Sequence, residues 1–386
     1  MKISKVTPHI VGDRSAAATL DRNFLFVTVD TDSGLRGLGE GGITWREEAM
    51  AGAVEAMASG LIGQDPFRTE HLWQEMFRGA FFPAGRIGCA ALSAIDIALW
   101  DIKAQALGVP LYQLLGGAVR ERVACYAHIR GRSADELAQD AKRRVAEGFR
   151  FLRTELRAEA DGRTFEPSAA VRRGIEDFRA LRAAVGDEIE LTVDVHTRLD
   201  PADAIAFCRA LEPYRPYFVE DPIRMENFAS FRKLARHVAV PLAAGEQYAS
   251  KWEFREQIEE ELIDFARIDL CIVGGFSEAL KIVGACETHY IKLAPHNPLG
   301  PVSTAACLHL DLAASYFGVQ ELPRIPGTYL EDVFPLQAPY ESGHLLTPTR
   351  PGLGITFDES AALARRPLNA RSAPRFARSD GSFQNW

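Results

Sequence analysis

Eight short runs of apolar residues recur along the chain between residues 118 and 325, each rich in Val, Ile, Leu and Phe. Because these runs are continuous rather than alternating, they are typical of strands that are buried on both faces of a parallel sheet. The runs cover residues 125–129, 151–156, 190–195, 217–220, 241–245, 265–270, 290–294 and 318–322.

Polar residues that start helices lie between these runs. Ser133 is followed three residues later by Glu136, which is the spacing of a capping box, and Asp200 precedes a proline. A strand followed by a helix, repeated eight times, predicts an α/β fold with a TIM-like (β/α)8-type barrel over residues 118–325. The alternative is a doubly wound open sheet, but residues 130–133 lack the glycine-rich turn that follows the first strand of such a sheet.

The first 117 residues follow a different pattern. An apolar run at residues 24–29 is followed by helical patterns, and the clearest of these covers residues 91–107 and ends before Gly108. We therefore expect an N-terminal α+β capping domain at residues 1–117. Residues 326–386 are looser in pattern, and we expect this C-terminal segment to return to the capping domain.

Ionisable side chains stand in register at the ends of six successive runs. In a barrel of this kind the carboxyl ends of all strands meet at one rim, where the chemistry takes place. The spacing therefore predicts one cluster of charged side chains. Its members are Asp194, Glu220, Glu246, Asp269, His296 and Glu321, each 23 to 27 residues after the one before it.

Three of these residues, Asp194, Glu220 and Glu246, are predicted to hold a metal ion. Three neighbouring negative charges are strongly unfavourable in a partly dry site unless a cation neutralises them. Oxygen ligands without cysteine or clustered histidine favour Mg²⁺, with Mn²⁺ as an alternative, over zinc.

Two histidines stand out by their position. His196 follows Asp194 by two residues, so strand alternation would point both side chains the same way. His296 lies across the barrel, where Asp269 would hold one ring nitrogen and so fix the tautomer and the basicity of the imidazole. The prediction is a His–Asp pair on one side of the metal and a single histidine on the other.

The composition narrows the class of protein. The 386 residues carry a formal net charge of −8, whereas nucleic-acid binding needs a basic face. We therefore expect small molecules as partners, and we expect neither nucleic acid nor a membrane to be a partner. No apolar run approaches the roughly 20 residues of a membrane span, and the start of the chain lacks a signal-peptide pattern, so we expect a cytoplasmic protein. The six cysteines are scattered without a C-x-x-C pair, which favours reduced thiols.

Eight motifs along nearly the whole chain together resemble the enolase superfamily, in its mandelate racemase-like subgroup, and within it the galactonate dehydratase-type sugar-acid dehydratases. They are Gly-Leu-Gly-Glu at 37–40, Ala-Leu-Trp-Asp-Ile-Lys at 98–103, Leu-Leu-Gly-Gly at 114–117, Val-Asp-Val-His at 193–196, Val-Glu-Asp-Pro at 219–222, Ala-Gly-Glu at 244–246, Leu-Ala-Pro-His-Asn-Pro-Leu-Gly-Pro at 293–301 and Pro-Gly-Leu-Gly-Ile at 351–355.

The resemblance implies an enolase-style barrel and a Mg²⁺-dependent dehydration of an acid sugar. His296, assisted by Asp269, would take the C2 proton of an aldonate, and His196 would protonate the departing 3-hydroxyl, which yields a 2-keto-3-deoxy acid. Glu321, either protonated or hydrogen-bonded to a carboxylate oxygen, would help to stabilise the enediolate. The resemblance also favours a symmetric homo-oligomer.

One stretch departs from the subgroup, because many members carry Lys-x-Lys at the end of the second strand and this chain has Arg153-Thr154-Glu155. Only eight of the 44 basic residues are lysine, so proton abstraction would fall to histidine. Arg153, Glu155 and His128 are expected to bind substrate, although Glu155 and His128 could instead be structural.

Two other functions stay open from the sequence. The first is an epimerase, racemase or cycloisomerase of a carboxylate, in which His196 and His296 act on opposite faces as the two acid/bases. The second is a non-catalytic relative, against which the intact set of predicted metal ligands argues.

Overall fold

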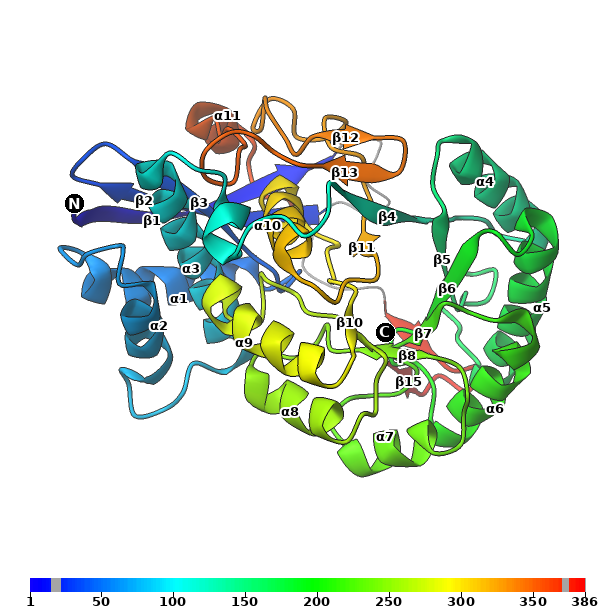
Figure 1. Cartoon of the computed structure of the whole chain (residues 1–386). Helices are drawn as coiled ribbons and strands as arrows, with labels where there is room; N and C mark the ends of the chain where they lie inside the picture. The colour runs from blue at the N-terminus through cyan, green and yellow to red at the C-terminus, as the bar shows by residue number, and fades with distance from the viewer. Residues whose placement is uncertain (15–21, 370–374, 386) are drawn as a thin grey trace.

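The computed structural model describes residues 1–14, 22–369 and 375–385 of the chain. Its N-terminal part is an antiparallel sheet in the order β1-β2-β3 packed against helices, and it lies beside the barrel (Figure 1). This is the α+β arrangement that the sequence predicts. The elements are β1 (Ile3–Asp13), β2 (Arg22–Thr31), β3 (Arg36–Gly41), α1 (Glu47–Leu61), α2 (Thr69–Arg78), α3 (Gly85–Leu107) and a 3-10 turn at Leu111–Leu115.

Close contact between α3 and β3 depends on the glycines of the Gly-Leu-Gly-Glu motif. A Cβ atom on Gly39 would lie 1.7 Å from the carbonyl oxygen of Ala94, and one on Gly37 would lie 2.0 Å from that of Ala98. Any side chain at either position would therefore push the helix away from the sheet. The helix ends where the sequence predicts, at Gly108, which has a left-handed conformation.

The barrel consists of eight parallel strands that follow one another around a ring. Neighbouring strands pair in sequence order, β11 pairs with β4, and a bridge between Leu293 and Phe317 joins β10 to the segment that leads into β11. The ring is closed, which excludes the open doubly wound sheet. The strands are β4 (Arg122–His128), β5 (Phe151–Glu155), β6 (Glu190–Asp194), β7 (Phe218–Glu220), β8 (Leu242–Ala244), β9 (Phe265–Ala266), β10 (Lys292–Leu293) and β11 (Gln320–Glu321).

Each of the first seven barrel strands is followed by a helix, but the eighth is not. After β11 the chain runs through turns and bends, because Pro323 and Pro326 are poorly suited to a helix and Gly327 has a φ of 78°. The barrel type is as predicted, whereas the eighth repeat of the strand–helix unit is a strand alone. The helices are α4 (Ala134–Ala146), α5 (Pro167–Val185), α6 (Pro201–Leu211), α7 (Phe228–Ala235), α8 (Lys251–Glu259), α9 (Gly275–Thr288) and α10 (Pro301–Ala313), with a 3-10 turn at Glu212–Tyr214.

The C-terminal segment contacts both parts of the molecule. One part of it reaches the N-terminal sheet, since α11 (Glu359–Ala364) packs on β1. Another part stays with the barrel, since β13 (His344–Leu346) pairs with β4 and with β12 (Tyr340–Glu341). The hairpin of β14 (Phe376–Ala377) and β15 (Phe383–Gln384) lies near the rim, where Gln384 donates to the carbonyl of Arg198. Residues 370–374 and 386 of this segment lie outside the described part.

Buried carboxylates connect the N-terminal domain to the barrel. Glu40, the last residue of the Gly-Leu-Gly-Glu motif, accepts hydrogen bonds from the backbone N–H of Gly300 at 2.7 Å and of Ser303 at 2.8 Å. These groups belong to the first turn of α10, whose N–H groups have no partner within the helix. In the same way Asp96 accepts from the backbone and the hydroxyl of Ser277 at the start of α9.

We expect Glu40→Ala to destabilise the protein by about 1–3 kcal/mol, because it leaves two buried N–H groups of α10 without an acceptor. Thermal unfolding monitored by circular dichroism would measure the loss as a lower Tm. Glu48→Ala is the matched control, since Glu48 is exposed on α1. Equal Tm values for the two variants would show that the contact contributes nothing.

All six cysteines are buried and free, as expected for reduced thiols. In the part of the chain that the structure covers, no helix is both long and apolar enough to cross a membrane.

Candidate active site

Alternation along the strands places the charged side chains at the barrel mouth. A layer of apolar side chains fills the barrel interior, and it includes Tyr126, Phe218, Phe265, Ala294 and Val319. Along β4 and β7 and into β11 every second residue points the same way, so the residue two positions after the apolar one also faces inward, one level nearer the carboxyl ends. In the segments that follow β9 and β10 the charged residues stand at the same spacing, just beyond the strand ends. The residues in those positions are His128, Glu220, Arg267, His296 and Glu321.

The three predicted metal-binding carboxylates lie together at this mouth. Asp194 and Glu220 are the last residues of β6 and β7 and are partners in the strand register. Glu246 follows β8 by two residues. Each of the three offers a carboxylate oxygen, and these oxygens lie within 4.8 Å of one another.

Two buried arginines partly neutralise this cluster. Arg153 on β5 forms an ion pair with Asp194. Arg267 is 1% exposed and joins Glu220, at 2.5 Å, to Glu321, at 2.7 Å. Arg267 is not among the residues predicted for the site, although a charged residue within the apolar run 265–270, two positions before Asp269, is a usable signal.

The cluster still holds more negative charge than its basic neighbours compensate. Oε2 of Glu220 is buried and has no hydrogen-bond partner among the described residues. Burial, with the charges of Asp221 and Asp194, raises the pKa of Glu246 well above its usual value. Unpaired, closely spaced oxygen donors of this kind fit a hard divalent cation such as Mg²⁺.

His296 and Asp269 form the predicted pair on one side of the cluster. Nδ1 of His296 lies 2.7 Å from Oδ2 of Asp269, and its Nε2 lies 3.4 Å from Oε2 of Glu246. Burial lowers the pKa of His296, but the charges of Glu246 and Asp269 outweigh it and raise the pKa to about 9. The bond to Asp269 fixes the ring so that Nε2 faces the carboxylate cluster.

His196 lies on the other side of the cluster, but not for the predicted reason. Strand β6 ends at Asp194, and His196 has a φ of 51°, so a left-handed turn rather than strand alternation sets the direction of its side chain. Nε2 of His196 lies 3.0 Å from Oδ2 of Asp194 and 3.0 Å from Nη2 of Arg153. Its Nδ1 lies 3.6 Å from Glu155. The expected proximity is present, and the turn produces it.

Glu321 is ionised rather than protonated. Burial opposes the charged form, but Arg267 and the hydrogen bond from His128, at 2.9 Å, lower the pKa of Glu321 well below its usual value. The backbone N–H of Asn297 also donates to it at 2.8 Å. These neighbours supply donors and positive charge and so favour the ionised form, whereas the predicted contact of Glu321 with a substrate carboxylate stays a prediction.

The three residues predicted to bind substrate lie at the same mouth but differ in exposure. Arg153 is buried, and the His128 side chain is 15% exposed between Glu321 and Arg153. Burial and the charge of Arg153 lower the pKa of His128 to about 4, so this imidazole is neutral at pH 7. The Glu155 side chain is 47% exposed and is the most accessible of the three.

Comparison with known proteins agrees with this architecture. A family described as mandelate racemase / muconate lactonizing enzyme, N-terminal domain, matches residues 4–116, and one described as enolase C-terminal domain-like matches residues 136–361. The D-galactonate dehydratase of Ralstonia nicotianae is 36% identical over 100% of both chains. A D-mannonate dehydratase of a Caulobacter species is 35% identical over 95% of this chain and 96% of its own.

A solved structure has nearly the same fold. An enolase from Pantoea ananatis with bound D-gluconate and Mg has a TM-score of 0.91 and 31% sequence identity, and the match covers 99% of each chain. The relatives named as sugar-acid dehydratases are hydro-lyases, and the matches cover 100% and 96% of their chains. The resemblance drawn from the sequence motifs is therefore confirmed. The chain belongs to the mandelate racemase/muconate lactonizing enzyme group of the enolase superfamily.

Proposed function

We propose that the protein is a Mg²⁺-dependent dehydratase that converts an acid sugar, an aldonate, into a 2-keto-3-deoxy acid. The observation that carries the proposal is the placement of one histidine on each side of a three-carboxylate cluster, with His296 held by Asp269. Full-length relatives named D-galactonate and D-mannonate dehydratase support the substrate class.

Asp194, Glu220 and Glu246 would hold the Mg²⁺, with Mn²⁺ as a substitute. A bound dication would supply positive charge opposite the two oxygens of the enediolate that forms when the proton next to a carboxylate leaves. Arg153 and Arg267 add fixed positive charge next to Asp194 and Glu220.

His296 would take the proton from C2 through Nε2, the nitrogen that faces the cluster, in its neutral form. The charge of Glu246 raises the pKa of this imidazole, and a cation held by Glu246 would offset that charge and favour the neutral form. Asp269 keeps the other nitrogen protonated and stabilises the imidazolium that results. Across the cluster, His196 would deliver a proton to the departing 3-hydroxyl. Glu321, charged and held by Arg267, would orient His128 and the backbone of Asn297 rather than act as an acid.

Arg153, His128 and Glu155 would bind the hydroxyls of the sugar. Glu155 is accessible and lies 3.6 Å from His196, so a hydroxyl that it binds would be placed near the proton donor. Arg153 cannot replace the family lysine as a base, because a guanidinium keeps its proton at any pH compatible with the fold.

The test is turnover of a panel of aldonates and aldarates by the Mg²⁺-loaded protein in D₂O. A dehydratase forms a 2-keto acid, which semicarbazide detects, whereas an epimerase or racemase exchanges deuterium at C2 without forming a keto acid. We expect a keto acid from at least one aldonate. Exchange alone would favour the epimerase, and neither signal on any acid sugar would favour the non-catalytic relative.

Two further expectations from the sequence stay proposals. The boundaries at residues 117 and 325 would be tested by limited proteolysis. A symmetric homo-oligomer, which we propose from the family resemblance alone, would be tested by light scattering.

A further inference from the structure

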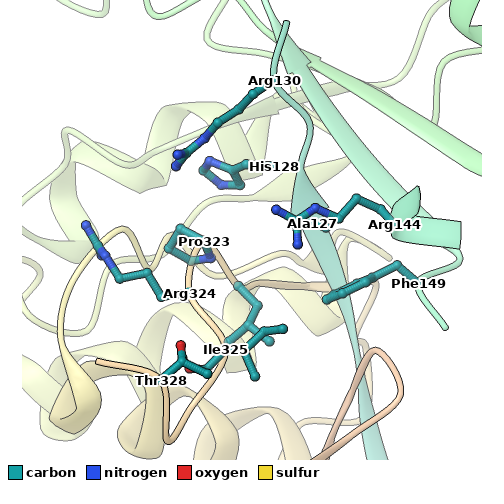
Figure 2. A pocket seen from close by; sticks show the side chains of 10 residues that line it. Ala127, His128, Arg130, Arg144, Phe149, Pro323, Arg324, Ile325 and Thr328 are labelled. Carbon is teal, nitrogen blue, oxygen red and sulfur yellow. The ribbon is translucent and has the colours of Figure 1, made fainter. Parts of the chain in front are cut away.

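A cavity of about 260 Å³ lies at the outer side of the barrel wall, where β4, α4 and the segment after β11 meet (Figure 2). This is the place that an eighth helix would cover, and the turns after β11 leave it open. The lining residues are Ala127, His128, Arg130, Arg144, Phe149, Leu322, Pro323, Arg324, Ile325 and Thr328.

The charged side chains that line this cavity are all cationic. They are Arg130, Arg144 and Arg324, which lie beside the neutral imidazole of His128 and the hydroxyl of Thr328, and none of the lining residues is a carboxylate. Figure 2 shows the three guanidinium groups coming from different segments of the chain. Burial and the charges of Arg324 and Arg144 lower the pKa of Arg130, whereas the charges of Glu155 and Asp140 oppose that shift.

The neighbouring acceptors leave some N–H groups of each guanidinium without a hydrogen bond. Arg144 pairs with Glu147 at 2.9 Å, and Arg324 donates to the carbonyl of Pro298 at 3.1 Å. Nε of Arg144 and Nε of Arg324 are nevertheless buried and without a partner within the described ranges. The side chain of Arg130 makes no hydrogen bond or ion pair that the structure records within those ranges.

The cavity shares one wall with the active site. His128 lines the cavity, and its Nε2 lies 2.9 Å from Glu321, which Arg267 in turn joins to Glu220. A ligand in the cavity would therefore lie one side chain away from the catalytic cluster. In barrels of this type the loops near the eighth strand frequently form a phosphate-binding site.

We propose that this cavity binds a compact anionic group, a carboxylate or a phosphate, through Arg130, Arg144 and Arg324. Guanidinium groups pair with the oxygens of these anions through charge-assisted hydrogen bonds, and the buried Nε groups of Arg144 and Arg324 have donors to spare for such an anion. The group belongs either to the far end of a dianionic acid sugar whose carboxylate faces the cluster or to a separate anionic metabolite. Both sources present the same chemistry to the arginines.

The test compares wild type with an Arg130→Gln, Arg324→Gln double variant, using inorganic phosphate as the probe in isothermal titration calorimetry. The protein is loaded with Mg²⁺ throughout. Phosphate that binds at the carboxylate cluster would bind wild type and variant equally, because neither substitution lies in that cluster. We expect the double variant to bind phosphate at least about tenfold more weakly. Arg143→Gln on the exposed side of α4 is the matched control and should bind like wild type.

A kinetic arm distinguishes the two sources. If the far end of the substrate occupies the cavity, the double variant loses kcat/KM on aldarates and phosphorylated aldonates but not on simple aldonates. If a separate metabolite occupies it, phosphate binding weakens while kcat/KM falls on none of these substrates. Equal phosphate affinity in wild type and variant would overturn the proposal. Arg130→Gln alone, which removes an exposed side chain, serves if the double variant does not fold.

The calorimetric arm does not need turnover. A protein that binds phosphate at the arginines but dehydrates nothing would refute the proposed dehydratase and leave the anion site standing. A protein that dehydrates aldonates but shows no arginine-dependent phosphate binding would refute the anion site and leave the proposed dehydratase standing.

Discussion

His296→Asn is expected to lower kcat by about 10²–10⁴-fold, the usual contribution of a positioned general base. The asparagine amide can still donate a hydrogen bond to Asp269, so the packing around this buried carboxylate is preserved. It offers no nitrogen that can accept the C2 proton. The loss should therefore appear in kcat on the best aldonate from the panel, with Mg²⁺ binding unchanged.

Deuterium exchange gives the same variant a second readout. If His296 removes the C2 proton, its replacement stops the exchange of that proton with D₂O, which proton NMR follows directly. His196→Asn should differ, because in the proposed mechanism it blocks departure of the 3-hydroxyl and leaves exchange at C2 in place. Exchange lost in both variants would instead favour two opposed bases, as in an epimerase.

The matched control is His289→Asn. His289 follows α9, at the end of the barrel away from the mouth, and pairs with Glu261 at 3.2 Å, so it reproduces a histidine–carboxylate pair at a distance from the cluster. Wild-type kcat in this control shows that the substitution as such does no harm. If His296→Asn kept more than a tenth of wild-type activity, His296 could not be the base.

The positions of the catalytic candidates could be predicted because strand ends repeat at a nearly constant interval. Asp194, Glu220 and Glu246 each end a short apolar run, and parallel strands bring such ends to one rim whatever the helices between them. The pair of Asp269 and His296 follows from the same rule. These are properties of register, which the order of residues carries directly.

Contacts that depend on conformation rather than register were not predictable in the same way. Arg267 joins Glu220 and Glu321, residues 47 and 54 positions away, and only the closed ring brings the three together. The left-handed turn at His196 could not be predicted, because no glycine occupies that position. Pro323 and Pro326 did mark the absence of an eighth helix, but the regular spacing of the preceding repeats outweighed that signal.

Removing the metal is expected to abolish turnover and to destabilise the fold. Treatment with EDTA leaves Asp194, Glu220 and Glu246 with oxygens within 4.8 Å of one another and no dication between them. Returning Mg²⁺ at about 100 times its Kd should stabilise the native state by about 2.7 kcal/mol, because only the folded protein assembles the three ligands. Differential scanning calorimetry with and without Mg²⁺ measures this as a rise in Tm.

Glu246→Gln should separate the destabilising repulsion among the three carboxylates from their role in binding Mg²⁺. Of the three proposed ligands, Glu246 is the one that pairs with no arginine within the described residues, and it lies 3.4 Å from Nε2 of His296. A neutral amide removes the repulsion, so we expect the metal-free variant to be more stable than metal-free wild type by about 0.5–2 kcal/mol. Addition of Mg²⁺ should not raise the Tm of this variant, and the variant should be inactive.

Glu188→Gln, an exposed substitution in the loop before β6, should leave both the Mg²⁺-dependent rise in Tm and the turnover unchanged. A lower Tm for metal-free Glu246→Gln than for metal-free wild type would contradict this expectation, since it would mean that the Glu246 side chain stabilises the fold without the ion. The opposite result, higher stability with no activity, would show that the protein maintains three opposed carboxylates at the expense of its own stability, which only a bound cation offsets.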